Sequence, residues 1–245
     1  MKVFKGIVGK YKKIVIDSRD KMEEAALYYG ALPFFHNTVR GFSVAEMTLP
    51  GLLFGGDEGF DGCWEWKGPV IRRKTAAYGK FFKRKAGFVS LDLLPDFLNY
   101  RHYKYPVKPD STDEMILEII RENDGLTSTD LRKLINGTFG DLKRFPDAMP
   151  TDFEPTVKIK RSSLEGPLQR LQMGGWLIID DFKYKQSSRG ERYGWGVASY
   201  STPELWFGDL PEVKRSPEES LDYMAAKIAE RWHHAAKKNI GKLLE

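Results

Sequence analysis

Two groups of side chains in the second half of the chain suit contact with nucleic acid. Gln169, Arg170 and Gln172 lie within about one helical turn, and glutamine and arginine can bond the edges of bases in pairs. Basic residues before and after them suit the phosphate backbone, which positions a protein without specifying a sequence. We therefore expect Gln169, Arg170 and Gln172 to face bases. The expected phosphate contacts are Lys160, Arg161, Lys185, Arg189 and Arg192.

A further basic stretch runs from Arg72 to Lys85, where seven cations stand without an acid. Tyr78, Phe81 and Phe82 are interleaved with these cations. Basic residues among aromatic ones suit a surface that follows phosphates while bases stack beside it. An amphipathic hairpin, with aromatic side chains in the core and lysines in solvent, fits the pattern equally well. The phosphate-binding candidates here are Arg72, Arg73, Lys83, Arg84 and Lys85.

The elements that must position these residues follow the order of a winged helix-turn-helix. Capping patterns at Ser111–Glu114 and Thr127–Asp130 predict two helices, and Ser162 or Gly166 begins a third. β-forming residues on either side of a turn at 187–190 then predict a hairpin with a basic tip. In a winged helix the third helix enters the major groove and the hairpin meets phosphate. A protein-docking module with a solvated basic hairpin is the alternative.

The first half predicts a second unit of the same kind. Alternation in Cys63–Pro69 indicates a strand with Trp64 and Trp66 on one face and Glu65 and Lys67 on the other. The expected fold is therefore α+β, with tandem winged-helix modules and a C-terminal packing helix that begins at Ser216. The predicted domains are 1–108, 109–207 with an insertion at about 139–160, and 208–245.

The composition of the 245 residues is that of an ordinary globular protein, with a net charge of +5. This mild cationic excess is compatible with nucleic acid. The single cysteine, Cys63, excludes an intramolecular disulfide and argues against a cysteine-based zinc site. We find no membrane-length apolar run, metal-binding spacing or phosphate loop. We therefore expect a cytoplasmic protein without cofactor or metal, monomeric rather than dimeric.

Two longer strings carry a family resemblance. They are Gly62–Pro69 continuing to Tyr78–Phe82, and Tyr193–Ala198 followed by Ser201–Glu204. Over about residues 15–235 the chain resembles bacterial relatives of the AlkZ-like (YcaQ-like) winged-helix DNA glycosylases. The resemblance implies tandem winged helices around a DNA-binding concavity. It also implies excision of alkylated or crosslinked bases.

The chain departs from that family at its catalytic motif. The glycosylases carry Gln-x-Gln or Gln-x-Asp, whereas neither Gln169, Gln172 nor Gln186 has such a partner two residues later. Glu65 is the best alternative carboxylate for stabilising an oxocarbenium-like sugar. A charge pair between Glu65 and Lys67 on one strand face is the simpler interpretation.

Three hypotheses remain open from the sequence. The first is a DNA-binding protein related to repair glycosylases, with catalysis unproven. The second is an active glycosylase that uses Glu65 or another group. The third is a winged-helix module for protein–protein interaction or transcriptional regulation. The first requires cations from both halves to converge on one concave surface.

Overall fold

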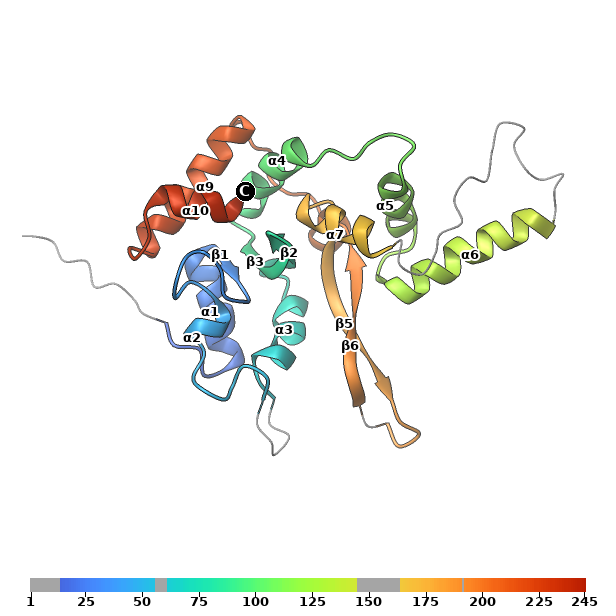
Figure 1. The fold of residues 1–245 in the computed structure, drawn as a ribbon, viewed down its shortest axis with the longest axis horizontal. Helices are drawn as coiled ribbons and strands as arrows, with labels where there is room; N and C mark the ends of the chain where they lie inside the picture. Colours follow the sequence, from blue (N-terminus) through green and yellow to red (C-terminus); the bar gives the residue numbers. More distant parts are fainter. Residues whose placement is uncertain (1–13, 56–60, 145–163, 191) are drawn as a thin grey trace, which may run out of the picture.

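The structure is a computed structural model that describes residues 14–55, 61–144, 164–190 and 192–245. Within these ranges the chain forms ten helices and two three-stranded antiparallel sheets, so the predicted α+β class is confirmed. Figure 1 shows that the β5–β6 hairpin projects between the N-terminal elements and helices α5 and α6. No helix in the described ranges is both long and apolar enough to span a bilayer.

The N-terminal unit is a helix, a short strand, two helices and a hairpin. Its elements are α1 (Arg19–Tyr29), β1 (Ala31–Pro33), α2 (Val44–Met47), α3 (Cys63–Arg72), β2 (Ala76–Phe82) and β3 (Lys85–Ser90). Strand β3 lies in the middle of the sheet, in the order β1-β3-β2. The last strand in the sequence, β3, therefore pairs with both β1 and β2, so the β2–β3 hairpin is attached to β1.

The second unit repeats this order. Its elements are α5 (Thr112–Glu122), β4 (Leu126–Thr127), α6 (Ser128–Arg144), α7 (Glu165–Met173), β5 (Ile178–Gln186) and β6 (Arg192–Ser201). The sheet order β4-β6-β5 again places the last strand in the middle. The two halves thus share one topology of helix, strand, helix, helix and hairpin.

Helix α4 (Leu94–Lys104) connects the units, and α8 (Pro203–Phe207), α9 (Pro217–Arg231) and α10 (Lys237–Leu244) follow the second hairpin. Helix α9 packs on α4 and α10, as expected for a C-terminal packing element. A large core joins the first unit to α9, α10 and the base of β5, where Ile178 and Ile179 are buried. A smaller core lies among α5, α6 and α7. The hairpin base therefore fixes the two units together.

Three predicted helix starts, at Ser111, Thr127 and Ser216, are confirmed by side-chain caps, whereas α7 begins at Glu165 without one. The Ser111 hydroxyl accepts from the Glu114 amide at 3.2 Å, and Ser216 with Glu219 forms a reciprocal capping box. Asp130 accepts from both the amide and the hydroxyl of Thr127 at 3.1 and 2.6 Å. These hydrogen bonds hold the pKa of the Asp130 carboxyl below its ordinary value. Caps are local, which is why they could be predicted from sequence.

The strand predicted for Cys63–Pro69 is wrong, because the segment is the start of helix α3. Cys63, Lys67, Val70 and Ile71 are buried at helical spacing, a pattern that the alternation of Trp64 and Trp66 obscures. Backbone bonds from the amides of Cys63 and Trp64 to Leu52 and Leu53 hold the helix start at 2.9 and 3.0 Å. These partners are distant in sequence, so the pattern alone did not reveal the helix.

Asparagine and glycine are common at helix ends, so the pair Asn136–Gly137 predicts that the helix stops there, and this prediction is wrong. Helix α6 continues past the pair to Arg144 and has 17 residues in all. Each glycine in a helix costs about 1 kcal/mol relative to alanine, and a helix of this length can tolerate the two that it contains, Gly137 and Gly140. The remainder of the predicted insertion, 145–160, lies outside the described residues.

Candidate nucleic-acid interface

The β5–β6 hairpin carries exposed cations at its far end. Lys185 and Arg189 are exposed, and neither forms an ion pair with a described residue. The turn is closed by the Gly190 amide, which donates to the Ser187 carbonyl at 2.9 Å, and Gly190 has φ +78°. A left-handed backbone favours glycine at this position. The hairpin therefore holds two charges away from the body, where phosphate can reach them.

The remaining predicted cations of this region are placed differently or lie outside the description. Lys160 and Arg161 fall in the range that is not described, and so does the side chain of Arg192. A further cation of β5, Lys183, donates from its ammonium group to the carbonyl of Gly125. Of the predicted hairpin phosphate ligands, Lys185 and Arg189 are thus the two whose side chains the structure describes.

The β2–β3 turn presents a second, smaller group of cations. Lys83 and Arg84 are exposed at the turn with φ of 48° and 72°. The ammonium group of Lys85 donates to the His36 carbonyl at 2.6 Å, which fixes its direction. The aromatic residues of this stretch belong to the core, because Tyr78, Phe81 and Phe82 are at most 2% exposed. Of the two interpretations of residues 72–85, the amphipathic hairpin is therefore the one that fits.

Three predicted phosphate ligands are neutralised by carboxylates. Arg72 pairs with Asp181, a contact that also ties α3 to β5. Arg73 bonds to Glu23 and, at 2.7 Å, to Asp20 on α1. Arg170 makes two bonds to Asp113, at 2.6 and 2.9 Å. These pairs leave little net charge at the three positions, so we do not retain Arg72, Arg73 or Arg170 in the interface.

Helix α7 does not present the expected base-reading face. Gln172 is 1% exposed. Its amide accepts from the backbone N–H of Lys80 at 3.2 Å and donates to the Leu168 carbonyl at 3.0 Å. Gln169 is half-buried on the same helix, which packs against β2 and α5. The expectation that Gln172 reads bases is therefore wrong, because the first unit covers its side of α7.

Glu65 has a structural role at the start of α3. Its carboxylate accepts from the Gly62 amide at 3.2 Å, which completes the N-terminal turn. The charge pair predicted with Lys67 across a strand face does not apply in a helix, where i and i+2 do not face each other. The neighbouring carboxylates Asp180 and Asp181 on β5 do not form an acid–base pair, because Asp181 binds Arg72 while Asp180 is buried beside Gly125. Burial raises the pKa of the Asp180 carboxyl.

Lys67 is a buried lysine that sequence reasoning assigned to a surface pair. It is 2% exposed, and its ammonium group donates to the Trp64 carbonyl. The nitrogen lies 3.6 Å from the centre of the Trp64 ring and 4.3 Å from that of Phe182. Burial lowers the pKa of Lys67 to about 8, and nearby Glu65 opposes this shift. The available sequence signal was helical spacing, because Lys67 falls on the same helix face as the apolar residues Cys63, Val70 and Ile71.

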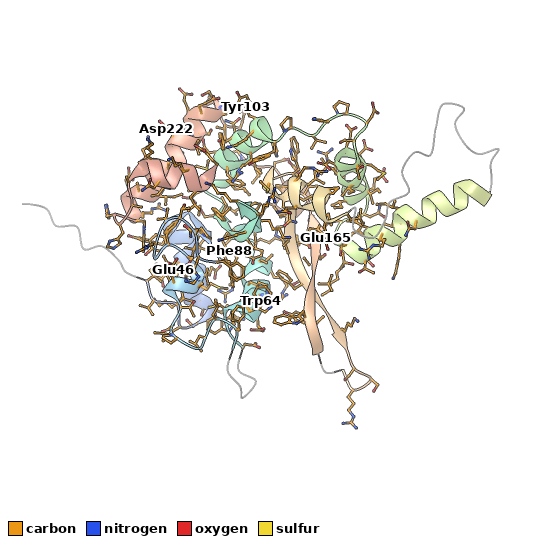
Figure 2. The ribbon with its side chains drawn as sticks, viewed as in Figure 1. Glu46, Trp64, Phe88, Tyr103, Glu165 and Asp222 are labelled. Atoms are coloured by element: carbon orange, nitrogen blue, oxygen red, sulfur yellow. The ribbon has the colours of Figure 1, made fainter. Side chains whose placement is uncertain are left out.

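An exposed aromatic cluster beside the hairpin was also missed. Trp64 on α3 contacts Phe54 at a ring distance of 5.9 Å and Trp195 on β6 at 5.8 Å. Figure 2 shows Trp64 next to the hairpin. We call Phe54, Trp64 and Trp195 the aromatic cluster. The Gly-Trp-Gly string at 194–196 was the available sequence signal for an unusual tryptophan position.

Among the described residues, no group of three or more His, Cys, Asp and Glu side chains is arranged to hold a metal ion.

Comparison with known families gives one finding. A family model described as AlkZ related matches residues 16–245. No curated protein and no solved structure matches the chain.

Proposed function

Because the chain belongs to the AlkZ-related family, we propose that it is a DNA-binding protein related to DNA repair glycosylases. Its two units would act as winged helices in tandem, with the β5–β6 hairpin as the main contact to DNA. The observation that carries this proposal is the exposed pair of cations at the hairpin tip, Lys185 and Arg189, neither of which forms an ion pair with a described residue.

The winged-helix part rests on the repeated topology. Each half has a helix, a short strand, two helices and a hairpin, and each sheet places its last strand in the middle. That element order is the one expected of a winged helix, in which the hairpin is the wing. A shared order in two halves of one chain favours tandem copies of one module over two unrelated folds.

The mode of contact differs from that of a typical helix-turn-helix. Helix α7 would be the recognition helix of the second unit, yet Gln172 is bonded to the first unit and Arg170 to Asp113. The exposed cations of the β5–β6 hairpin and of the β2–β3 turn remain available to contact phosphate. Since phosphate contacts carry no sequence information, we propose binding that depends little on sequence.

Base excision through Glu65 receives no support from the geometry. The Glu65 carboxylate is half-buried and caps its own helix. A catalytic carboxylate instead needs to reach the sugar of an extruded nucleotide. We therefore propose DNA binding and leave excision outside the proposal.

The proposal is tested by charge reversal at the hairpin tip. Lys185→Glu with Arg189→Glu is compared with Lys238→Glu, which changes an exposed lysine on α10, away from the hairpin (Figure 1). Anisotropy of a labelled duplex at low salt should show at least about tenfold weaker binding for the hairpin variant only. Absence of binding by the wild type, or equal losses in both variants, would overturn the proposal.

A further inference from the structure

The aromatic cluster is unusual because two of its members are exposed. Among the described residues the most exposed large apolar side chains are Trp195 at 73%, Tyr103 at 63% and Phe54 at 59%. Two of these three lie against Trp64, so they form a group and not scattered exceptions. Exposed aromatic groups that lie together mark binding surfaces more often than single exposed residues do.

The hairpin backbone is shaped to deliver Trp195 to this group. Lys183 pairs with Val197 and Lys185 with Tyr193, so one residue of β5 stands opposite three residues of β6. Gly194, within this bulge, has φ +74°. A side chain at Gly196 would collide with the ring of Tyr184. Bulges re-aim side chains, and here the two glycines allow Trp195 to meet Trp64 in a T-shaped contact with an interplanar angle of 84°.

The inner side of the cluster is fixed by buried and half-buried groups. Lys67 lies over the Trp64 ring at 3.6 Å, and Phe34 and Phe35 contact the same ring at 6.0 and 6.1 Å. Trp64 is thus held from within, while Phe54 and Trp195 extend outward from its margins. A planar ligand can meet exposed rings without moving the core.

The neighbouring charge indicates what kind of planar ligand fits. Lys185 directly follows the β5 residue that faces the bulge, and Arg189 lies at the turn beyond it. The hairpin therefore places cations for phosphate and aromatic rings for stacking on one short segment. Nucleic acid offers both partners, and an unpaired base exposes its ring face to a protein without insertion into a stacked duplex.

We propose that the aromatic cluster stacks an unpaired base of DNA while the hairpin cations hold the adjacent phosphates. This inference rests on the proposed DNA-binding function and specifies its substrate as DNA with an unpaired base. A protein that docks through apolar side chains is the competing occupant. It would leave DNA binding independent of Trp195.

The test compares a duplex that contains a single-base bulge with its fully paired counterpart. The bulged base is 5-iodo-2′-deoxyuridine, which crosslinks under light to an aromatic ring stacked on it. We expect tighter binding of the bulged duplex and a crosslink at Trp195 or Phe54. Trp195→Ala should weaken bulge binding about 5- to 150-fold and leave paired-duplex binding unchanged. Trp195→Phe should recover part of the loss.

Tyr103→Ala is the matched control, since Tyr103 is also exposed but lies on α4, well separated from Trp64 in Figure 2. It should alter neither affinity. The stacking proposal alone fails if the protein binds the paired duplex but binds the bulged duplex no more tightly. It also fails alone if Trp195→Ala does not selectively weaken binding of the bulged duplex. Both proposals fail if neither DNA binds at low salt. Thermal unfolding of each variant checks that the fold is retained.

Discussion

Replacing the buried Lys67 by methionine should make the protein more stable at neutral pH. Methionine has nearly the same length and no charge to desolvate. Lys67 is 2% exposed and forms no ion pair with a described residue. Its partners are the Trp64 carbonyl and the rings of Trp64 and Phe182. These contacts must offset the cost of burying a charged ammonium group.

The magnitude follows from the pKa of Lys67. A value of about 8 against the ordinary 10.5 means that burial disfavours the charged form. At about 1.4 kcal/mol per pH unit, the difference amounts to roughly 3 kcal/mol. Ring contacts that the substitution removes are worth about 1–2 kcal/mol in a desolvated site. We therefore expect Lys67→Met to raise the free energy of unfolding by about 1–2 kcal/mol at pH 7.

The pH dependence provides the sharper signature. Between pH 8 and 10.5 the unfolded chain keeps the Lys67 proton that the folded protein has lost. The unfolded state then binds more protons, so this group makes wild-type stability rise with pH. Methionine has no such contribution. The advantage of Lys67→Met should accordingly shrink by about 2 kcal/mol from pH 7 to pH 9.5.

Urea unfolding of both proteins at these two pH values measures the effect. Subtracting the free energy of unfolding of the wild type from that of the variant at each pH cancels the contribution of all other titrating groups. Lys238→Met, at an exposed position, is the control and should show no such trend. A stability difference for Lys67→Met that does not change with pH would refute the reasoning, because it would mean that Lys67 titrates normally.

Three further predictions concern single side chains. Burial lowers the pKa of His102 to about 4, and its ring stacks on Trp176 at 3.6 Å. The unfolded chain gains this proton below pH 6.5, so stability should fall by about 2 kcal/mol from pH 7 to pH 5. Urea unfolding should show that loss in the wild type and not in His102→Phe. Gly62→Ala should lower the free energy of unfolding by about 1–3 kcal/mol, because a Cβ would collide with the Gly55 backbone; a stable variant in thermal unfolding would contradict this. Glu65→Ala should lower the free energy of unfolding by about 1 kcal/mol, because the cap on the Gly62 amide is lost. Its duplex affinity, measured by anisotropy, should stay unchanged. A selective loss of affinity would show that Glu65 contacts DNA.

The sequence predicted those elements whose signals are local. Ser111 and Ser216 stand beside the amides that they cap, so their patterns identified real helix starts. The prediction for the residues of α3 failed because strand alternation and helical spacing fit the same residues. The contacts that favour the helix, such as the Cys63 amide on the Leu52 carbonyl, come from a separate loop.

The candidate site was harder to predict than the fold, because its charges are decided by distant neighbours. Arg73 appeared free in an acid-poor stretch, yet Asp20 lies 53 positions away in sequence and 2.7 Å away in space. The position of Trp195 depends on a bulge, which shifts the alternation that a strand pattern assumes. Lys185 and Arg189 remained interface candidates because a projecting hairpin has few neighbours.

The most direct test of the proposed DNA contact is the salt dependence of duplex affinity. The logarithm of the binding constant should fall linearly with the logarithm of salt, by about 0.9 for each neutralised phosphate. Lys185→Ala with Arg189→Ala should reduce that slope by about 2. An unchanged slope in this double variant, or no wild-type binding at low salt, would contradict the central claim that the hairpin holds DNA.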